Sequence, residues 1–338
     1  MAELANVRGF EDLWRQINEP RRYTKGLFDA GSIRVELRRL VSRPPLAMVT
    51  NMARPKSHGA LQNHLLYISR HGELALRGRD GERLIGRERI VERADDWALD
   101  QVRYRGGVAL AYTMVLSMPP GTPAEPVEMA ARSFAASEFS QNDFLTVLHL
   151  DRPHPHVHLA VRAESDDARH HPSKIADLYR WPEVFAAKLR DAGLEADGAP
   201  RWVRGVVIKP LNPKVRHAMD DYRDGRGGPI RFVAEDHREA LDIARGFDVG
   251  DRPWERAIAE RQRKTREGYL ALADHLEAMN EAGDQDLAHD LRRFVQDMAP
   301  VRTRRELLVE QARDYDRRRA LERLSDRERR IGAPERDR

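Results

Sequence analysis

The chain has 338 residues, with Lys+Arg 59 against Asp+Glu 55, a formal net charge of +4 and no cysteine. This length can hold one large domain plus an appendage, with a sizeable core. The lack of cysteine excludes disulfides, thiolate metal sites and cysteine nucleophiles. A net positive charge leaves room for a surface that binds a polyanion such as nucleic acid.

The N-terminal region predicts an amphipathic helix, because Phe10, Leu13, Trp14 and Ile17 recur at helical spacing. A strand is expected over residues 32–40, followed by a basic connection, so residues 1–50 are interpreted as an N-terminal helix and basic extension. The start lacks a signal peptide and no apolar run approaches membrane-spanning length. We therefore expect a cytoplasmic protein without membrane insertion.

A helix is predicted from Ser57, a good N-cap, to about Arg70, with Gly72 ending it. Its core stripe is formed by leucine and isoleucine at positions 61, 65 and 68. Tyr67 lies off that stripe, beside His64, where its hydroxyl can face a neighbouring cleft. Taken alone, such a tyrosine is more often a half-buried surface residue.

The next elements are read from alternation and from helix breakers. Residues 73–105 predict loops and a short helix, residues 108–118 a strand, and residues 126–139 a helix. Beyond the histidine-rich stretch, a helix is expected over 182–191 and a linker over 216–250. Residues 251–338 predict a charged helical region, with a helical hairpin that turns at Gly283 and a third helix over 303–330.

The stretch over residues 144–161 is the most informative part of the sequence. Two apolar strands flank a short turn, and four histidines fall within ten positions: His149, His154, His156 and His158. Because side chains alternate along a strand, His156 and His158 share a face, and His149 joins them if the strands pair antiparallel. Three imidazoles then converge on one volume, which suits a transition metal more than calcium. His154 is interpreted as a fourth ligand or as a group that orients one.

Three segments resemble a mobilisation-type relaxase, in the MobA/VirD-like branch of the HUH endonuclease superfamily. They are residues 66–72 (LYISRHG), 116–121 (LSMPPG) and 149–158 (HLDRPHPHVH), in the family's order and spacing. The resemblance covers about residues 50–210. It implies an α+β fold with a mainly antiparallel central sheet flanked by helices, to which the α-helical C-terminal region is added. Residues 51–215 are accordingly expected to form the catalytic domain.

The resemblance also implies an activity. Relaxases nick one DNA strand at a transfer origin, and their tyrosine, matching Tyr67, stays attached to the 5′ end and later allows religation. His149, His156 and His158 match the metal-binding histidines. The expected cofactor is a divalent ion, Mg²⁺ or Mn²⁺, with Zn²⁺, Ni²⁺ and Co²⁺ as alternatives. Expected partners are single-stranded or supercoiled origin DNA, a relaxosome accessory protein and a type IV secretion coupling protein.

Further site residues follow from charge and from two departures from the family pattern. Pro153 stands where relatives often carry an acidic residue, and Arg162 where they often carry asparagine. Asp151 is the nearest carboxylate to the histidines, so it is a candidate to orient a ligand or accept a proton. The candidate DNA-binding residues are the basic positions Arg70, Lys174, Arg201 and Arg204.

Three alternatives remain open at this point. A rolling-circle replication initiator shares the chemistry, although its tyrosine usually follows the histidines. A HIT-type nucleotide hydrolase also has alternating histidines, one of which is its nucleophile, and it needs no metal. A non-enzymatic relaxosome DNA-binding protein requires that the metal site be empty.

Overall fold

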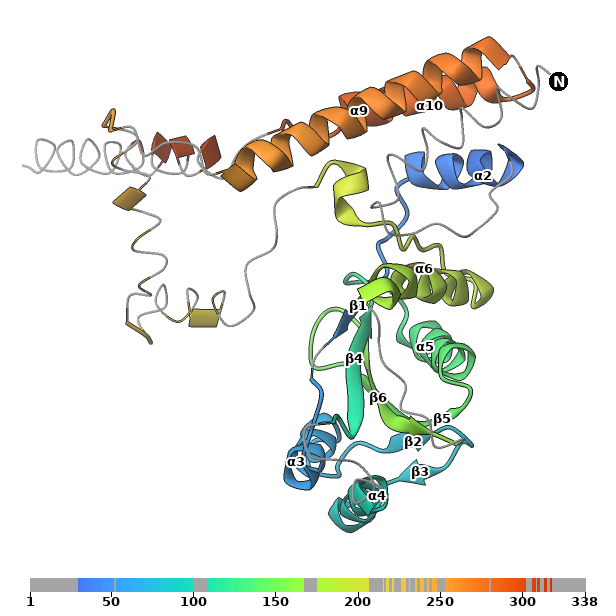
Figure 1. Ribbon diagram of the computed structural model, residues 1–338, viewed down its shortest axis with the longest axis vertical. Helices are drawn as coiled ribbons and strands as arrows, with labels where there is room; N and C mark the ends of the chain where they lie inside the picture. Colours follow the sequence, from blue (N-terminus) through green and yellow to red (C-terminus); the bar gives the residue numbers. More distant parts are fainter. Residues whose placement is uncertain are drawn as a thin grey trace, which may run out of the picture. The chain divides into compact units, whose positions relative to one another are not determined.

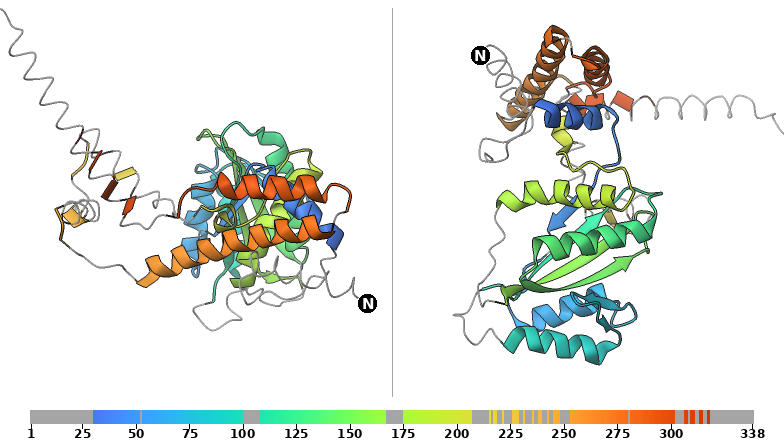
Figure 2. Two further views of the ribbon diagram at one scale, coloured as in Figure 1. Left: turned by 90° about the horizontal axis from the view of Figure 1, so that it is seen from above. Right: turned by 90° about the vertical axis from the view of Figure 1, so that its right-hand side faces the viewer.

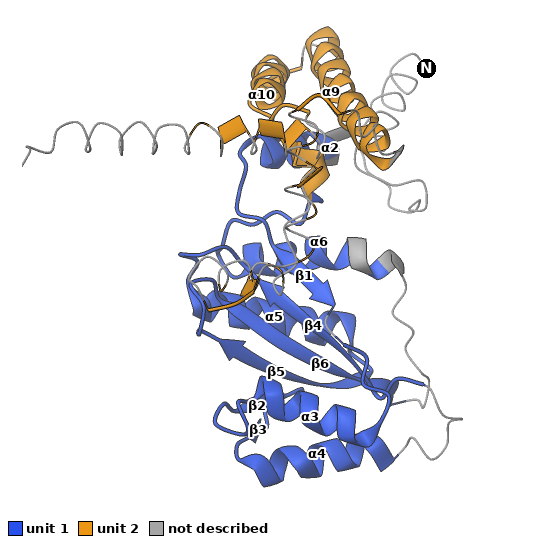
Figure 3. Ribbon diagram, turned by 90° about the vertical axis from the view of Figure 1, so that its left-hand side faces the viewer, with its two compact units in different colours: residues 1–200 blue, residues 201–338 orange. Residues whose placement is uncertain are grey.

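A computed structural model of the chain describes residues 30–51, 53–99, 108–166, 175–206, 253–279 and 281–301, with scattered positions in 215–247 and 306–317. The chain divides into two compact units, residues 1–200 and residues 201–338 (Figure 3). The expected helix around Phe10, most of the expected linker, most of the third C-terminal helix and Lys174 lie outside the described residues.

The first unit is built on a six-stranded sheet in the order β1-β4-β6-β5-β2-β3 (Figure 1). The strands are β1 (Met48–Asn51), β2 (Leu76–Gly78), β3 (Arg83–Leu84), β4 (Ala111–Ser117), β5 (Asn142–His149) and β6 (His156–Ser165). Every neighbouring pair is antiparallel. The mainly antiparallel sheet expected from the sequence is therefore confirmed, and the β5–β6 hairpin lies at its centre.

Helices cover both faces of this sheet, as the side view in Figure 2 shows. One face carries α5 (Ala124–Glu138) and α6 (Ile175–Asp191), and the other carries α3 (His58–Ile68) and α4 (Arg87–Leu99). The central hairpin supplies the first core with Phe144, Val157, Leu159 and Val161. It supplies the second core with Leu145, Val147 and Ala160. Because side chains alternate across a strand, these two sets point to opposite faces.

The core between the sheet and α5 and α6 is rich in aromatic rings. Phe134 contacts Phe139, Trp181 and Phe185 edge-on, with ring centroids 6.2 to 6.4 Å apart. The indole of Trp181 also donates a hydrogen bond to Glu138, 3.1 Å away. Edge-to-face pairs add stability beyond the apolar area they bury, so Trp181 is a residue of the core.

Three expected elements differ from the structure. The segment expected as a strand over 32–40 is helix α2 (Ala30–Val41), because Ile33, Leu37 and Leu40 are buried at helical spacing. The helix expected to start at Pro182 is α6, which begins at Ile175 and continues through the proline. Residues 73–105 contain two short strands and the full helix α4, where only loops and a short helix were expected.

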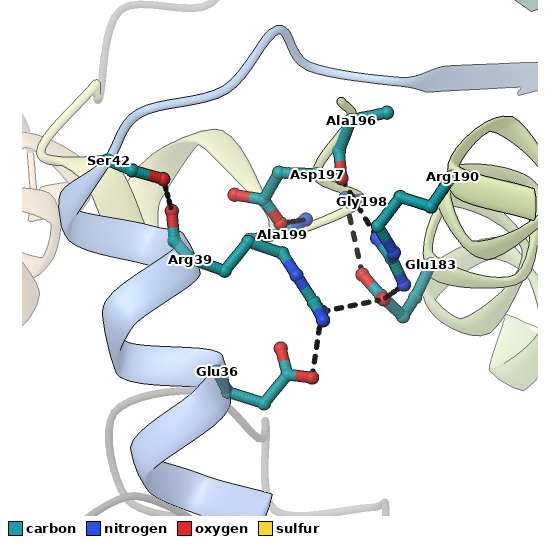
Figure 4. A network of polar contacts seen from close by, with 9 residues as sticks. All are labelled: Glu36, Arg39, Ser42, Glu183, Arg190, Ala196, Asp197, Gly198 and Ala199. Atoms are coloured by element: carbon teal, nitrogen blue, oxygen red, sulfur yellow. Dashed lines mark hydrogen bonds and ion pairs between the residues drawn. The ribbon is translucent and has the colours of Figure 1, made fainter. Parts of the chain in front are cut away.

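A polar network ties α2 and the loop after α6 to the middle of α6 (Figure 4). Glu183 accepts hydrogen bonds from Arg190 at 2.8 Å and from the backbone N–H of Gly198 at 3.2 Å, and Arg39 lies 3.7 Å from it. Burial raises the pKa of Glu183, although Arg190 opposes the shift. A Cβ at position 198 would lie 2.4 Å from the backbone of Glu183, so only glycine allows this close approach.

The second unit contains the short 3-10 helix η2 (Arg201–Arg204) and, further along the chain, the predicted helical hairpin. The hairpin consists of α9 (Pro253–Met279) and α10 (Asp284–Gln296). Gly283, with φ of 79°, makes the turn between the two helices. Tyr269 packs edge-on against Phe294 and donates a hydrogen bond to the carbonyl of Val203, 3.0 Å away. Among the residues described, no helix combines the length and apolarity needed to cross a membrane.

Candidate metal centre and nucleophile

The hairpin register brings the three alternating histidines together. His149 at the end of β5 is paired directly with His156 at the start of β6, and His158 is opposite Val147. His158 and Ala160 are two residues apart in β6, and Ala160 belongs to the core under α3 and α4. The histidines therefore lie on the sheet face that α3 and α4 cover.

The three rings form a compact, buried cluster. One nitrogen from each of His149, His156 and His158 lies within 4.8 Å of the others, and the ring centroids are 4.3 to 5.4 Å apart. All three side chains are buried. Imidazole nitrogens bind zinc and similar ions at about 2.0–2.1 Å, so small ring rotations would bring all three onto one ion.

Hydrogen bonds to carbonyl groups determine which nitrogens are free. Nε2 of His149 lies 2.6 Å from the carbonyl oxygen of Ile68, and Nδ1 of His156 lies 3.2 Å from that of His154. A carbonyl only accepts, so these nitrogens carry the protons, and Nδ1 of His149 and Nε2 of His156 keep lone pairs. Nδ1 of His158 is buried without a hydrogen-bond partner. A divalent ion fits this donor set, because it would be bound by ring nitrogens whose lone pairs are not used in these hydrogen bonds.

The environment favours the neutral, metal-binding form of two of these histidines, His156 and His158. Burial lowers the pKa of His158 to about 3, and the charges of His149, His156, His64 and Arg70 add to the effect. Burial is also the main cause that lowers the pKa of His156. Neutral imidazole is the ligating form, so little proton release is needed for metal to bind at neutral pH.

Asp151 lies in the turn between β5 and β6, at the edge of the cluster. Its Oδ1 is 3.9 Å from Nε2 of His156, and its Oδ2 forms an ion pair with Arg70. Burial alone would raise the pKa of Asp151, but the charge of Arg70, a backbone hydrogen bond and the neighbouring histidines outweigh it and lower the pKa. Asp151 is therefore an anion at neutral pH that contacts both a histidine and an arginine.

Tyr67 lies at the last turn of α3, as expected, off the buried stripe of that helix. Its side chain is 54% exposed, whereas Tyr112 and Tyr269, the other tyrosines whose side chains the structure describes, are buried. The adjacent residue, Ile68, supplies the carbonyl that His149 contacts. The end of the tyrosine helix is thus bonded directly to the histidine cluster.

His64 lies beside the site, and no role was predicted for it. It lies three residues before Tyr67, on the same side of α3, and it lies close enough to His158 to lower the pKa of that ring. Burial lowers the pKa of His64 itself. The helical spacing of His64 and Tyr67 was visible in the sequence, but only the packing of α3 on the histidine face reveals its neighbours.

The remaining predicted residues are placed less centrally. His154 lies in the turn with its ring centroid 5.3 Å from that of His156, and it is not part of the three-nitrogen cluster. Arg70 is paired with Asp151. Arg201 and Arg204 lie in η2 of the second unit. Arg152, which the sequence analysis did not single out, is exposed and forms no ion pair or hydrogen bond with the residues described.

Comparison with known proteins finds a matching family model and several similar proteins. Residues 82–194 match the family described as "Relaxase: MobA/VirD2-like, nuclease domain", a range that contains the histidine cluster and Asp151 but starts after Tyr67. The chain is 27% identical over 214 residues to the T-DNA border endonuclease VirD2 of Rhizobium rhizogenes, covering 56% of this chain and 46% of that protein. It is 25% identical over 252 residues to VirD2 of Rhizobium radiobacter, covering 65% and 57%.

A third relative, VirD2 of Agrobacterium fabrum (strain C58 / ATCC 33970), is 28% identical over 214 residues, covering 56% of this chain and 45% of that protein. Each of these three curated proteins carries the same description, T-DNA border endonuclease. The chain spans about half the length of these relatives. The similarity therefore extends over only part of these longer proteins.

Proposed function

We propose that this chain nicks one strand of DNA at a transfer origin, with Tyr67 as the nucleophile. Residues 82–194 match the MobA/VirD2-like relaxase nuclease domain. The observation that carries the proposal is the hydrogen bond of 2.6 Å between His149 and the carbonyl of Ile68. It joins the end of the helix that carries an exposed tyrosine to a buried cluster of three imidazoles. In phosphodiester chemistry the tyrosine can supply the nucleophile, and the imidazoles can bind the metal ion that assists the reaction.

The proposed reaction is a transesterification. The phenolic oxygen of Tyr67 bonds to the scissile phosphorus while the bond to the 3′ oxygen breaks, so the phosphate and the 5′ end remain on the protein. The phenol releases its proton, and the departing 3′ oxygen takes one up. One phosphodiester is exchanged for another, so attack by the free 3′ hydroxyl can reseal the strand. A nuclease meant only for degradation would use water instead.

The roles of the other residues follow from their positions. His149, His156 and His158 would hold a divalent ion, which when bound neutralises the phosphate oxygens and supplies Lewis-acid assistance. The hydrogen bonds to the carbonyls of Ile68 and His154 orient two of these rings. Asp151, ionised and with its Oδ1 3.9 Å from Nε2 of His156, would place a negative charge beside the bound ion.

The proposal extends to substrate and partners by family analogy. The substrate is single-stranded DNA at the origin of a mobile element, exposed in supercoiled plasmid. A relaxosome accessory protein and a type IV secretion coupling protein are proposed as partners, and the cytoplasm as the location. Mg²⁺ or Mn²⁺ is the proposed ion.

The test is a covalent-adduct assay. The protein is incubated with Mn²⁺ and a pool of single-stranded oligonucleotides from its source replicon, each labelled at its 3′ end, and run on a denaturing gel. Label on the protein that EDTA and Tyr67→Phe both abolish, and that the buried-tyrosine control Tyr112→Phe retains, supports the proposal. Cleavage of the DNA without label on the protein would mean attack by water and would refute the tyrosine mechanism.

A further inference from the structure

The turn that follows the tyrosine helix is bonded to the histidine hairpin at two points. The first is the carbonyl of Ile68, which His149 contacts. The second is Arg70, whose guanidinium donates to Oδ2 of Asp151. The two contacts come from residues on either side of Ser69, and they reach the end of β5 and the turn that follows it. Together they hold the last turn of α3 against the metal-binding end of the hairpin.

The backbone of this turn is unusual. Arg70 and His71 have φ of 53° and 59°, in the left-handed region that few residues other than glycine adopt. Such conformations persist where surrounding contacts impose them, and they occur often at functional sites. Gly72, with φ of 98°, follows so closely against α4 that a Cβ would lie 2.7 Å from the backbone nitrogen of Arg87. The turn is therefore held from both sides, and the side chain of Arg70 is directed to Asp151.

The charge environment argues against a simple DNA contact for Arg70. Its guanidinium is already neutralised by Asp151, which lies between it and His156. Arg152, the neighbour of Asp151, is exposed and has no partner among the residues described, so it is the better placed of the two to bind a backbone phosphate. The two arginines thus have different environments at the edge of one site.

We propose that Arg70 is a positioning residue, whose bond to Asp151 sets the location of Tyr67 relative to the histidine cluster. This inference rests on the proposed function, because positioning matters only if Tyr67 attacks a phosphate held there. A planar guanidinium that binds a carboxylate is a directional link, so it holds one turn in one orientation. Misplacement of a nucleophile lowers the rate of attack and leaves the affinity for the substrate unchanged.

The experiment separates binding from reaction. DNA affinity is measured as a function of salt in a Tyr67→Phe background, which prevents cleavage, and the rate of adduct formation is measured at saturating DNA with Tyr67 intact. Arg70→Gln, Asp151→Asn and their double variant are compared with Arg70→Lys. Arg89→Gln is the control, because Arg89 is also a surface arginine paired with a carboxylate, Glu82.

We expect Arg70→Gln to lower the saturated rate at least tenfold while the dissociation constant changes less than twofold. Asp151→Asn should do the same, the double variant should be no slower than the slower single variant, and Arg70→Lys should recover part of the rate. Arg152→Gln should instead weaken binding and make the salt dependence shallower by about 0.7 in log–log slope, the value for one phosphate contact on a single strand. If Arg70→Gln gives that binding result with an unchanged saturated rate, Arg70 is a phosphate contact and the inference is wrong.

A measurement that does not depend on catalytic activity tests the link between Arg70 and Asp151 separately from the proposed function. The amides of His71 and Gly72 donate hydrogen bonds within the turn, to the carbonyls of Leu66 and Ser69. Hydrogen exchange of these amides in the metal-free protein should be at least tenfold faster in Arg70→Gln and Asp151→Asn than in Arg152→Gln. Failure of the wild-type protein to form any adduct would refute the function alone, whereas unchanged exchange in both variants would refute the link.

Discussion

Acidification should destabilise the metal-free protein through His158, and the size of the effect follows from its burial. Burial lowers the pKa of this residue from 6.5 to about 3. In the unfolded chain His158 takes up a proton near its ordinary pKa, whereas in the folded protein it resists protonation. Stability is thus fully present above pH 6.5 and is lost as the pH falls toward 3.

The size of the expected loss of stability follows from the shift in the pKa of His158. Between pH 7 and pH 5, a shift of this size corresponds to a loss of about 2 kcal/mol in the free energy of unfolding, from this one residue. His156 and His64, whose pKa values are also lowered by burial, add to the loss. The interval lies above the ordinary pKa of carboxylates, so histidines dominate it.

The assay is chemical denaturation in EDTA at pH 7, 6 and 5, for the wild-type protein and His158→Gln. Glutamine is uncharged throughout, so the variant should lose about 2 kcal/mol less than the wild type over this interval. His71→Gln serves as the control, because His71 is an exposed histidine near the same site. Parallel curves for the wild type and His158→Gln would show that His158 titrates normally, and the reasoning from burial would fail.

Three further predictions concern the metal, the turn after α3 and the start of α3. His156→Ala should lower the affinity for Mn²⁺ or Co²⁺ at least tenfold in a metal titration, and a variant that still binds one ion with wild-type affinity would remove His156 from the ligand set. Gly72→Ala should destabilise the protein by about 1–3 kcal/mol, because φ is 98° and a Cβ would lie 2.7 Å from the backbone of Arg87. Gly59→Ala, in α3 with nothing within 4 Å of the added Cβ, should stabilise it by about 0.5–1 kcal/mol, and equal effects of the two changes on the melting temperature would contradict this.

The sequence by itself determined the elements that carry the site. Strand alternation and an antiparallel hairpin are sufficient to put His149, His156 and His158 on one face, and the register confirms that grouping. Helical spacing was sufficient to leave Tyr67 off the buried stripe of α3, and Ser57 correctly marked the start of that helix. These features depend on local periodicity, which is a property of the sequence and does not depend on which elements pack together.

Secondary-structure predictions from local periodicity were wrong where tertiary packing decides which structure a segment adopts. Residues 32–40 were read as a strand, although the burial of Ile33, Leu37 and Leu40 shows a helix in the structure. Strands β2 and β3 are three and two residues long and acquire their form only by pairing within the sheet, β2 with both β3 and β5. Pro182 was interpreted as the start of a helix. In the structure α6 continues through this proline, and Trp181 and Phe185 on either side of it are packed in the core.

Only the tertiary structure decided how the two halves of the site meet. Alternation shows that the histidines share a face, but it does not show which helices cover that face. The hydrogen bond between His149 and Ile68 and the ion pair between Arg70 and Asp151 each join residues 81 apart in the chain. Contacts at such separation depend on how α3 docks on the sheet, and docking is decided by the fit of whole surfaces, which no local pattern in the sequence encodes.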